Sequence, residues 1–236
     1  MRKIFGFDSK AMRFLGKLTD LILLNLIYIV CCIPIITIGA AQAGLYTAVR
    51  SMRDDEDSLV SCYGAFFEGF RNGFKRITIA HMILLIIQGV MAWNLVLVYY
   101  FSAITDTAPV WVSVMSIVIV ALVQTLVPLF HSKFGCTVWQ LFRNAGYLII
   151  CNPITTLIVA VLMWLPVVIF LWNVTIFITI TPLWLLGYYA IVAAIAVHLF
   201  RTSFRILEQN FYERQEEEEA EALAESETTE TEEEAE

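Results

Sequence analysis

The sequence predicts an all-α fold, a polytopic transmembrane helical bundle, on three observations. First, 59% of the 236 residues are hydrophobic and only 16% are charged, whereas a soluble domain has about 25% charged residues. Second, apolar runs of spanning length recur along the chain. Third, basic residues gather in some of the segments between these runs and are missing from others, which is typical of loops on opposite sides of a bilayer. Most of the chain must therefore face lipid or other apolar helices.

Five segments are strong predicted spans, because crossing the hydrocarbon takes about 20 apolar residues. They are residues 18–38, 77–101, 108–130, 147–171 and 181–200. Pro34 interrupts the first of them and Gly39 permits a bend, since proline removes a backbone donor and glycine tolerates a turn. A shorter apolar stretch near 35–49 follows, which predicts a possible sixth crossing that is short or re-entrant.

The predicted membrane domain, residues 18–215, lies between two segments of different character. Residues 1–17 carry five Lys and Arg among apolar positions and are expected to lie at the membrane interface. Residues 216–236 hold 12 of the 22 acidic residues and no basic one. Removing those 12 charges from the formal net charge of −7 leaves +5 on the rest of the chain. The tail is low in complexity and is expected to be disordered.

Charge in the loops predicts the topology. The loops at 102–107 and 172–180 contain no Lys or Arg, so both are expected outside the cell, with the C-terminus inside. A single crossing by residues 18–38 would place the five N-terminal positive charges outside. A bent hairpin over residues 18–49 instead places all 15 basic residues inside. The hairpin, with a cytoplasmic N-terminus, is the favoured arrangement.

A short motif occurs twice among the predicted cytoplasmic segments. The first copy is Phe70-Arg71-Asn72, and the second, 72 residues later, is Phe142-Arg143-Asn144. They fall in two predicted interfacial helices, residues 59–76 and 132–146, and each helix precedes a predicted transmembrane hairpin. The sequence therefore predicts two like-oriented repeats of interfacial helix plus hairpin. The six motif residues are candidates for docking a partner, and the alternative is that they pack under the bundle and anchor it to lipid.

Few residues in the spans could carry chemistry. Gln88, Asn94 and Gln124 are the main polar groups deep in the later spans, and they either line a path for a small solute or bridge helices. The four later spans contain no charged side chain, so an ion-coupled carrier would lack its usual group. His81, His131 and His198 near the span ends could hold a metal only if they converged.

Recognisable catalytic and cofactor motifs are missing from the chain. It contains no GxxxxGK[ST], GxSxG, HExxH or dinucleotide fingerprint. No catalytic residue, cofactor or metal is therefore predicted, and neither is a nucleic-acid partner. The lipid bilayer is the one partner that the composition requires, and the sequence leaves the oligomeric state open.

Several stretches of the N-terminal half resemble a known family. They are Arg13 to Asp20, Asn25, Pro34 to Ala40, Leu45-Tyr46, Phe66-Phe67 and Phe70 to Lys75. Over roughly residues 5–205 the chain is similar to the YesL family of bacterial membrane proteins of unknown function. The resemblance implies a bacterial cytoplasmic membrane protein, and the genes of such proteins often neighbour carbohydrate uptake transporters. It offers no catalytic residues.

The function expected from these observations is that of an accessory or regulatory component linked to bacterial carbohydrate uptake, with a transporter component as its partner. Two alternatives stay open. One is a small-solute transporter or channel that uses the three polar span residues. The other is an intramembrane enzyme, which would depend on the histidines.

Overall fold

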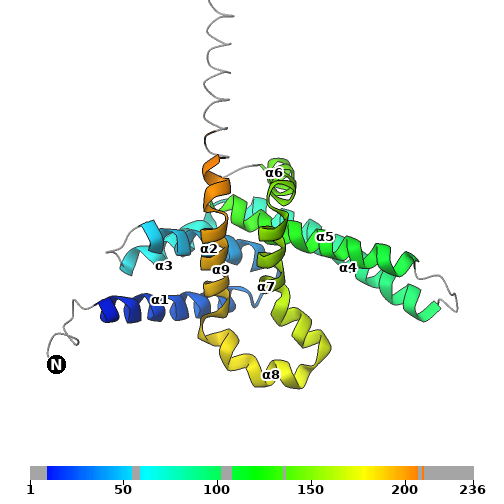
Figure 1. The fold of residues 1–236 in the computed structure, drawn as a ribbon, viewed down its shortest axis with the longest axis horizontal. Coiled ribbons are helices and arrows are strands. Elements are labelled where there is room, and N and C mark those ends of the chain that lie inside the picture. Colours follow the sequence, from blue (N-terminus) through cyan, green and yellow to red (C-terminus); the bar gives the residue numbers. More distant parts are fainter. Residues whose placement is uncertain (1–9, 55–58, 102–107, 135–136, 207–208, 210–236) are drawn as a thin grey trace, which may run out of the picture. The chain divides into compact units, whose positions relative to one another are not determined.

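The computed structural model describes residues 10–54, 59–101, 108–134, 137–206 and 209, and all regular structure in these residues is helical (Figure 1). The helices are α1 (Lys10–Cys31), the 3-10 turn η1 (Ile35–Thr37), α2 (Ile38–Asp54), α3 (Leu59–Arg71), α4 (Phe74–Phe101), α5 (Ala108–His131), α6 (Val138–Cys151), α7 (Pro153–Trp172), α8 (Val174–Leu183), the π-helical segment η2 (Trp184–Tyr188) and α9 (Tyr189–Leu199). The expected all-α class is confirmed. The acidic tail, the loop at 102–107 and residues 1–9 lie outside the described residues.

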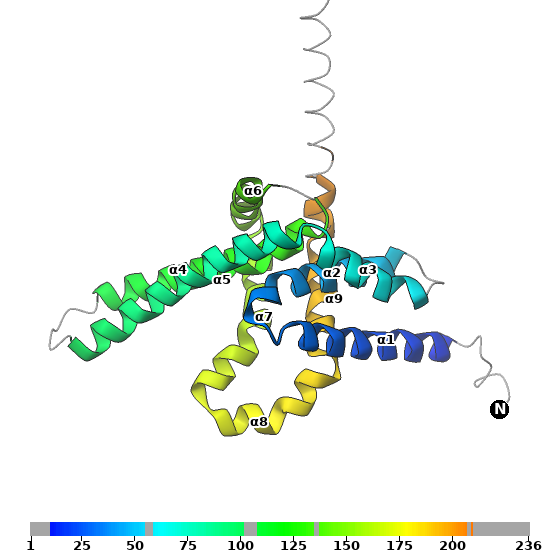
Figure 2. The same ribbon diagram turned by 180° about the vertical axis from the view of Figure 1, so that it is seen from behind.

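Four helices among the described residues are long and apolar enough to cross a membrane. They are Phe74–Val98, Val110–His131, Pro153–Trp172 and Val174–Leu199, the last of which joins α8, η2 and α9. The first two lie side by side as the α4–α5 hairpin in both views (Figures 1 and 2). These four segments overlap the four later predicted spans, so the chain is a membrane protein.

The boundaries of the last two spans differ from the prediction. α6 continues to Cys151, and the next helix starts at Pro153 rather than at residue 147, because proline suits the first turn of a helix but not its interior. The predicted loop at 172–180 is mostly helical. Asn173 begins α8 by accepting hydrogen bonds from the backbone N–H groups of Thr175 and Ile176 at 2.9 and 3.2 Å. A capped helix thus occupies most of the expected loop.

The break predicted around Pro34 is present, and the helix after it is the most buried of the fold. α1 ends at Cys31 and α2 begins at Ile38. Small side chains fill much of α2, and Ala40, Ala41, Ala43 and Ala48 are fully buried. A Cβ atom on Gly44 would lie 2.7 Å from the carbonyl oxygen of Phe66 in α3. The absence of that atom lets α2 and α3 pack with their backbones close together.

The last candidate span is broken at η2, and a side chain from α1 fills the break. Gly187 has φ 129°, outside the helical range. The Asn25 amide nitrogen donates to the carbonyl oxygens of Trp184 and Leu185 at 2.8 and 3.0 Å. The Asn25 amide oxygen accepts from the N–H groups of Tyr189 and Ala190 at 3.0 and 3.3 Å. These bonds satisfy backbone groups that the broken helix would otherwise leave unpaired.

Each of the two predicted interfacial helices is shorter in the structure than predicted at one of its ends. Residues 59–76 do not form one helix, because Gly73 has φ 69° and separates α3 from α4. The second helix begins at Val138 rather than at residue 132. At its start, Gln140 Oε1 accepts a hydrogen bond from the Thr137 backbone N–H at 3.0 Å, as in a capping box. Each helix still precedes a pair of candidate spans, as the repeat predicts.

The chain divides into two compact units, Met1–His198 and Leu199–Glu236. The first contains the helices described above, with α9 as far as His198. In the second, the described residues continue as helix from Arg201 to Ile206. There the Phe204 backbone N–H donates to the Phe200 carbonyl oxygen at 2.9 Å, and the two rings lie 6.1 Å apart.

Candidate functional sites

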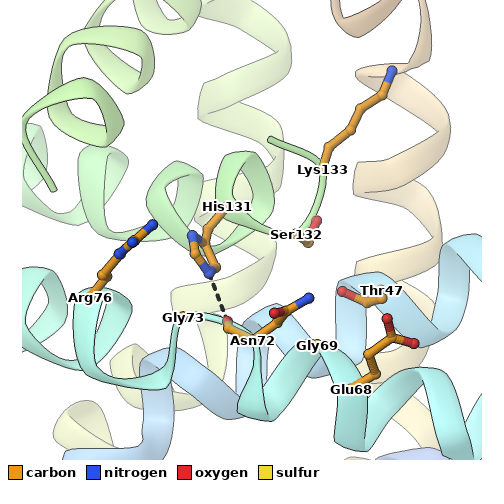
Figure 3. Close-up of a pocket in the computed structure, with 9 residues that line it drawn as sticks. All are labelled: Thr47, Glu68, Gly69, Asn72, Gly73, Arg76, His131, Ser132 and Lys133. Atoms are coloured by element: carbon orange, nitrogen blue, oxygen red, sulfur yellow. Dashed lines mark hydrogen bonds between the residues drawn. The ribbon is translucent and has the colours of Figure 1, made fainter. Parts of the chain in front are cut away.

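Two hollows in the first unit bring polar side chains together. The turn pocket has a volume of about 290 Å³ and lies where the α3–α4 turn meets the end of α5. Figure 3 shows Glu68, Asn72 and Arg76 on one side of it, with His131, Ser132 and Lys133 on the other. Thr47 of α2 completes its wall. The pocket therefore joins three segments that the charge pattern assigns to the cytoplasmic side.

A histidine in the turn pocket makes a hydrogen bond to the turn between α3 and α4. His131 is buried, and its Nε2 lies 2.9 Å from the Asn72 carbonyl oxygen (Figure 3). A carbonyl can only accept, so Nε2 carries the hydrogen and donates. Its other ring nitrogen, Nδ1, is buried with no hydrogen-bond partner among the described residues. A Cβ atom on Gly73 would overlap the imidazole ring, so glycine is needed both for the positive φ and for this contact.

The first motif copy is mostly used within the fold. The Phe70 ring is half-buried between Phe66 and Phe74, at centroid distances of 6.3 and 5.4 Å. The Asn72 backbone N–H closes the last turn of α3 by donating to the Glu68 carbonyl oxygen at 2.7 Å. Arg71, in contrast, is exposed at the end of the helix.

The second motif copy lies in the middle of α6 and does not end a helix. Phe142 and Asn144 are half-buried, while Arg143 is exposed. The buried face of the helix is formed by Leu141, Ala145 and Leu148. The two copies therefore differ in backbone structure, and what they share is one exposed arginine beside a half-buried phenylalanine.

The second hollow, here called the bundle cavity, has a volume of about 350 Å³ and lies where α1, α2, α4, α5, α7 and α9 meet. Its polar lining consists of Gln42, His81, Gln124 and Thr125, and its aromatic lining of Tyr28, Trp164 and Tyr189. The remaining lining residues are apolar, apart from Cys32. No Asp, Glu, Lys or Arg is among the described residues that line it. The described lining of the cavity is thus mainly apolar, with a few polar side chains and no charged one.

Hydrogen bonding in the bundle cavity is incomplete. Gln124 Nε2 lies 3.3 Å from His81 Nε2. The oxygens Gln124 Oε1 and Gln42 Oε1 are buried and have no hydrogen-bond partner among the described residues. The Trp164 indole N–H is satisfied, because it donates to Thr125 Oγ1 at 3.3 Å. Two glutamine side chains from different helices therefore have spare hydrogen-bonding capacity inside the bundle.

The three span residues named from sequence as a polar path do not lie together in the bundle cavity. Gln124 is 4% exposed and lines it, whereas Gln88 and Asn94 are not among its lining residues. Gln88 is half-buried and Asn94 is exposed on α4. Successive side chains of a helix point in different directions around its axis, so Gln88 and Asn94 of α4 need not face the cavity that Gln124 lines.

The three histidines have separate surroundings. His81 lies beside Gln124 in the bundle cavity, His131 binds Asn72 in the turn pocket, and His198 is exposed. Among the described residues, no group of three His, Cys, Asp or Glu side chains lies close enough to hold a metal ion.

A buried carboxylate links α1 to α3. Asp20 is 8% exposed, and the hydroxyl of Tyr63 donates to its Oδ1 at 3.0 Å. Burial, reinforced by this hydrogen bond and by the charge of Asp20, raises the pKa of Tyr63 to about 12. Tyr63 therefore keeps its proton at physiological pH and can act as the donor.

Comparison with protein families places a match on the N-terminal part of the chain. A family described as "Protein of unknown function, DUF624" matches residues 21–95. The chain is similar to this family over that segment, which is less than half of its length. The match is compatible with the resemblance to the YesL family noted above and, like it, brings no activity. Searches of curated proteins and of solved structures gave no match.

The matched segment contains more than half of the residues that line each hollow. It includes Gln42 and His81 of the bundle cavity, and Thr47, Asn72 and Gly73 of the turn pocket. Sequence reasoning did not assign Gln42 to a site, and it considered His81 only as a possible metal ligand. One usable signal was present, because Gln42 is a long polar residue within an otherwise small and apolar stretch. Its approach to α5 could not be read from the sequence.

Proposed function

We propose that this chain is a YesL-like, multi-pass protein of the bacterial cytoplasmic membrane that acts as an accessory or regulatory component of carbohydrate uptake. The family match and the four apolar helices support membership of a membrane family. The link to carbohydrate uptake comes from the resemblance described above, and the partner in this proposal is a component of a carbohydrate transporter.

The observation that carries the proposal is that Arg71 and Arg143 are both exposed. The phenylalanine before each of them is half-buried. α6 contacts both α4 and α5, so the second motif copy lies near the helix that follows the first copy. Trp139 of α6 is 77% exposed. Exposed Arg and Trp are enriched where proteins bind partners, and exposed cationic side chains favour an acidic partner surface.

Cytoplasmic placement of this surface is supported by contacts between segments that the charge pattern assigns to the same side. Arg50 Nη1 donates to the Ser132 carbonyl oxygen at 3.2 Å, and His131 binds Asn72. The Asp20–Tyr63 hydrogen bond adds the start of the first predicted span to this group.

The first predicted span fits a bent hairpin better than a full crossing. The apolar part of α1, from Leu18 to Cys31, covers about 21 Å at 1.5 Å per residue, while the hydrocarbon is about 30 Å thick. We therefore propose that α1 and α2 enter and leave from the cytoplasmic side, in addition to the four spans. Burial of α2 by its neighbours makes irregular backbone at this depth tolerable.

The docking proposal is tested by charge reversal. Arg71→Glu and Arg143→Glu, singly and together, are expected to remove the co-purifying transporter component after cross-linking in the native host. Arg205→Glu is the matched control, because Arg205 is also exposed but lies outside both motif copies. Membrane insertion should be unchanged in all variants. Equal recovery of the partner with the double variant and the control would refute docking through the motif.

The topology is tested with single cysteines in a background that lacks the native five. Lys3→Cys and Ala235→Cys should both resist an impermeant thiol reagent in intact cells and react after permeabilisation. If Lys3→Cys were labelled in intact cells while Ala235→Cys was protected, the proposal of a bent hairpin would be refuted.

A small-solute transporter is the second candidate, and the bundle cavity is the observation in its favour. The path expected from Gln88, Asn94 and Gln124 is not supported by a shared cavity. Uptake of labelled neutral solute by liposomes that contain the pure protein would place this candidate first.

A further inference from the structure

We propose that the bundle cavity binds an uncharged, hydroxyl-bearing small molecule of the polyol or simple-sugar class, held by the side chains of Gln42 and Gln124. Candidate spanning helices supply part of the lining of this site, and neither Arg71 nor Arg143 is among its lining residues. It goes beyond the proposed docking function and does not depend on it.

The same bundle contains two kinds of buried side-chain amide, one satisfied by the fold and one not. Asn25 is fully buried and makes four hydrogen bonds to the backbone around η2, so its amide is satisfied by the fold. Gln124 is nearly as buried but makes one long contact with His81, and its oxygen has no partner among the described residues. Gln42 Oε1 is also buried and has no hydrogen-bond partner among the described residues. Helix bridging, the common use of such residues, explains Asn25 and not the two glutamine oxygens.

The unpaired amide groups restrict the chemistry of a ligand that could bind them. A glutamine oxygen accepts, so the ligand must donate. If the Gln124 amide is turned so that its oxygen accepts from His81 Nε2–H, its NH₂ group is left instead, and the ligand must then accept. A hydroxyl group meets either requirement, because it donates one hydrogen bond and accepts others.

The lining and the volume of the cavity restrict the charge and the size of the ligand. No charged side chain is among the described residues that line the cavity, so an ionised ligand would be buried without a counter-ion, which is strongly unfavourable. The volume of about 350 Å³ lies at the lower end of the range for small-molecule pockets. Tyr28, Trp164 and Tyr189 supply apolar ring surface for the C–H groups of a polyol.

The test uses the full chain purified in detergent, with its melting temperature measured against increasing concentrations of glucose, myo-inositol and glycerol. The charged compounds glucuronate and glucosamine serve as probes of similar size. At least one neutral probe is expected to raise the melting temperature with saturation and to change the tryptophan fluorescence, to which Trp164 contributes. The charged probes should do neither.

The variants are Gln124→Leu and Gln42→Leu, with Gln88→Leu as the matched control on α4. Removing one hydrogen bond should weaken binding about tenfold for each cavity variant, and Gln88→Leu should bind like the wild type. The two cavity variants lie on different helices, so a folding defect in one leaves the other to decide.

Three results would overturn the proposal. They are no saturable response to any neutral probe, a response retained in both cavity variants, and equal loss in Gln88→Leu. A rise that is linear in concentration and equal in all variants would be general exclusion of the solute from the protein surface and would also count against the site. Loss of partner docking in the arginine variants is a separate outcome, because those residues lie outside the cavity.

Discussion

The amide nitrogen of Asn25 lies 2.8 Å from the carbonyl oxygen of Trp184, a residue 159 positions later in the chain. This contact joins α1 to the π-helical break in the last candidate span. Because Asn25 satisfies both carbonyl and N–H groups there, it stabilises a backbone that would be unfavourable in an apolar surrounding.

Replacement of Asn25 by alanine is expected to reduce the free energy of unfolding by about 1–3 kcal/mol, because buried backbone groups at η2 lose their partner. Denaturant unfolding of the full chain in detergent measures the change. Asn94→Ala is the control, since Asn94 is exposed on α4, and it should be close to neutral. Equal stability of the two variants would contradict the role of Asn25.

Alanine at the glycine that follows each motif copy, Gly73 or Gly146, should have different effects. Gly73→Ala is expected to destabilise the protein by about 1–2 kcal/mol from the positive φ alone, with a further cost from overlap with His131. Gly146→Ala should be neutral or stabilise by up to about 1 kcal/mol, because no atom lies near its Cβ position and alanine favours helix. Thermal melting of both variants measures the difference. Similar effects at both sites would show that the copies are not distinct in structure.

Close packing of α2 on α3 predicts a second contrast between glycines. Gly44→Ala places a methyl group against the Phe66 carbonyl and is expected to cost about 1–3 kcal/mol by overpacking. Gly64→Ala in α3 meets no atom within 4 Å, so it serves as the control and, like Gly146→Ala, should be neutral or slightly stabilising. Unfolding in detergent measures the stability of both variants. If Gly44→Ala were as stable as the wild type, α2 and α3 could move apart without a cost in stability.

The Asp20–Tyr63 pair predicts a pH dependence in the alkaline range. The pKa of Tyr63 is raised from 10.0 to about 12 in the folded protein by burial first and by Asp20 second. Above pH 10 the unfolded chain therefore loses this proton before the folded chain does, and the contribution of Tyr63 to stability is lost as pH rises from about 10 to 12.

Tyr63→Phe should abolish that part of the alkaline destabilisation while leaving neutral-pH folding possible. The measurement is the difference between wild type and variant in ultraviolet titration of tyrosine and in melting temperature against pH. Identical profiles for the two proteins would indicate that Tyr63 ionises at its ordinary pKa.

The sequence by itself determined the class of the protein and the approximate positions of its apolar helices. Hydrophobic length and composition are local properties, so residues 77–101 and 108–130 could be assigned without knowledge of their neighbours. The break near Pro34 was also predictable, because proline and glycine restrict or free the backbone wherever they occur. The same reasoning placed Arg71 and Arg143 in amphipathic helices, but it treated the two copies as equivalent.

Only the tertiary structure decided which polar groups meet. The sequence predicted a short or re-entrant segment near residues 35–49. The structure places α2 there, and it is the most buried of the described helices because its small side chains allow close approach. Gln124 was named from sequence, but its neighbour His81 lies 43 residues away and Asn25 finds its partners across more than 150. Hydrogen bonds between helices depend on the rotation and depth of each helix, which no local pattern specifies.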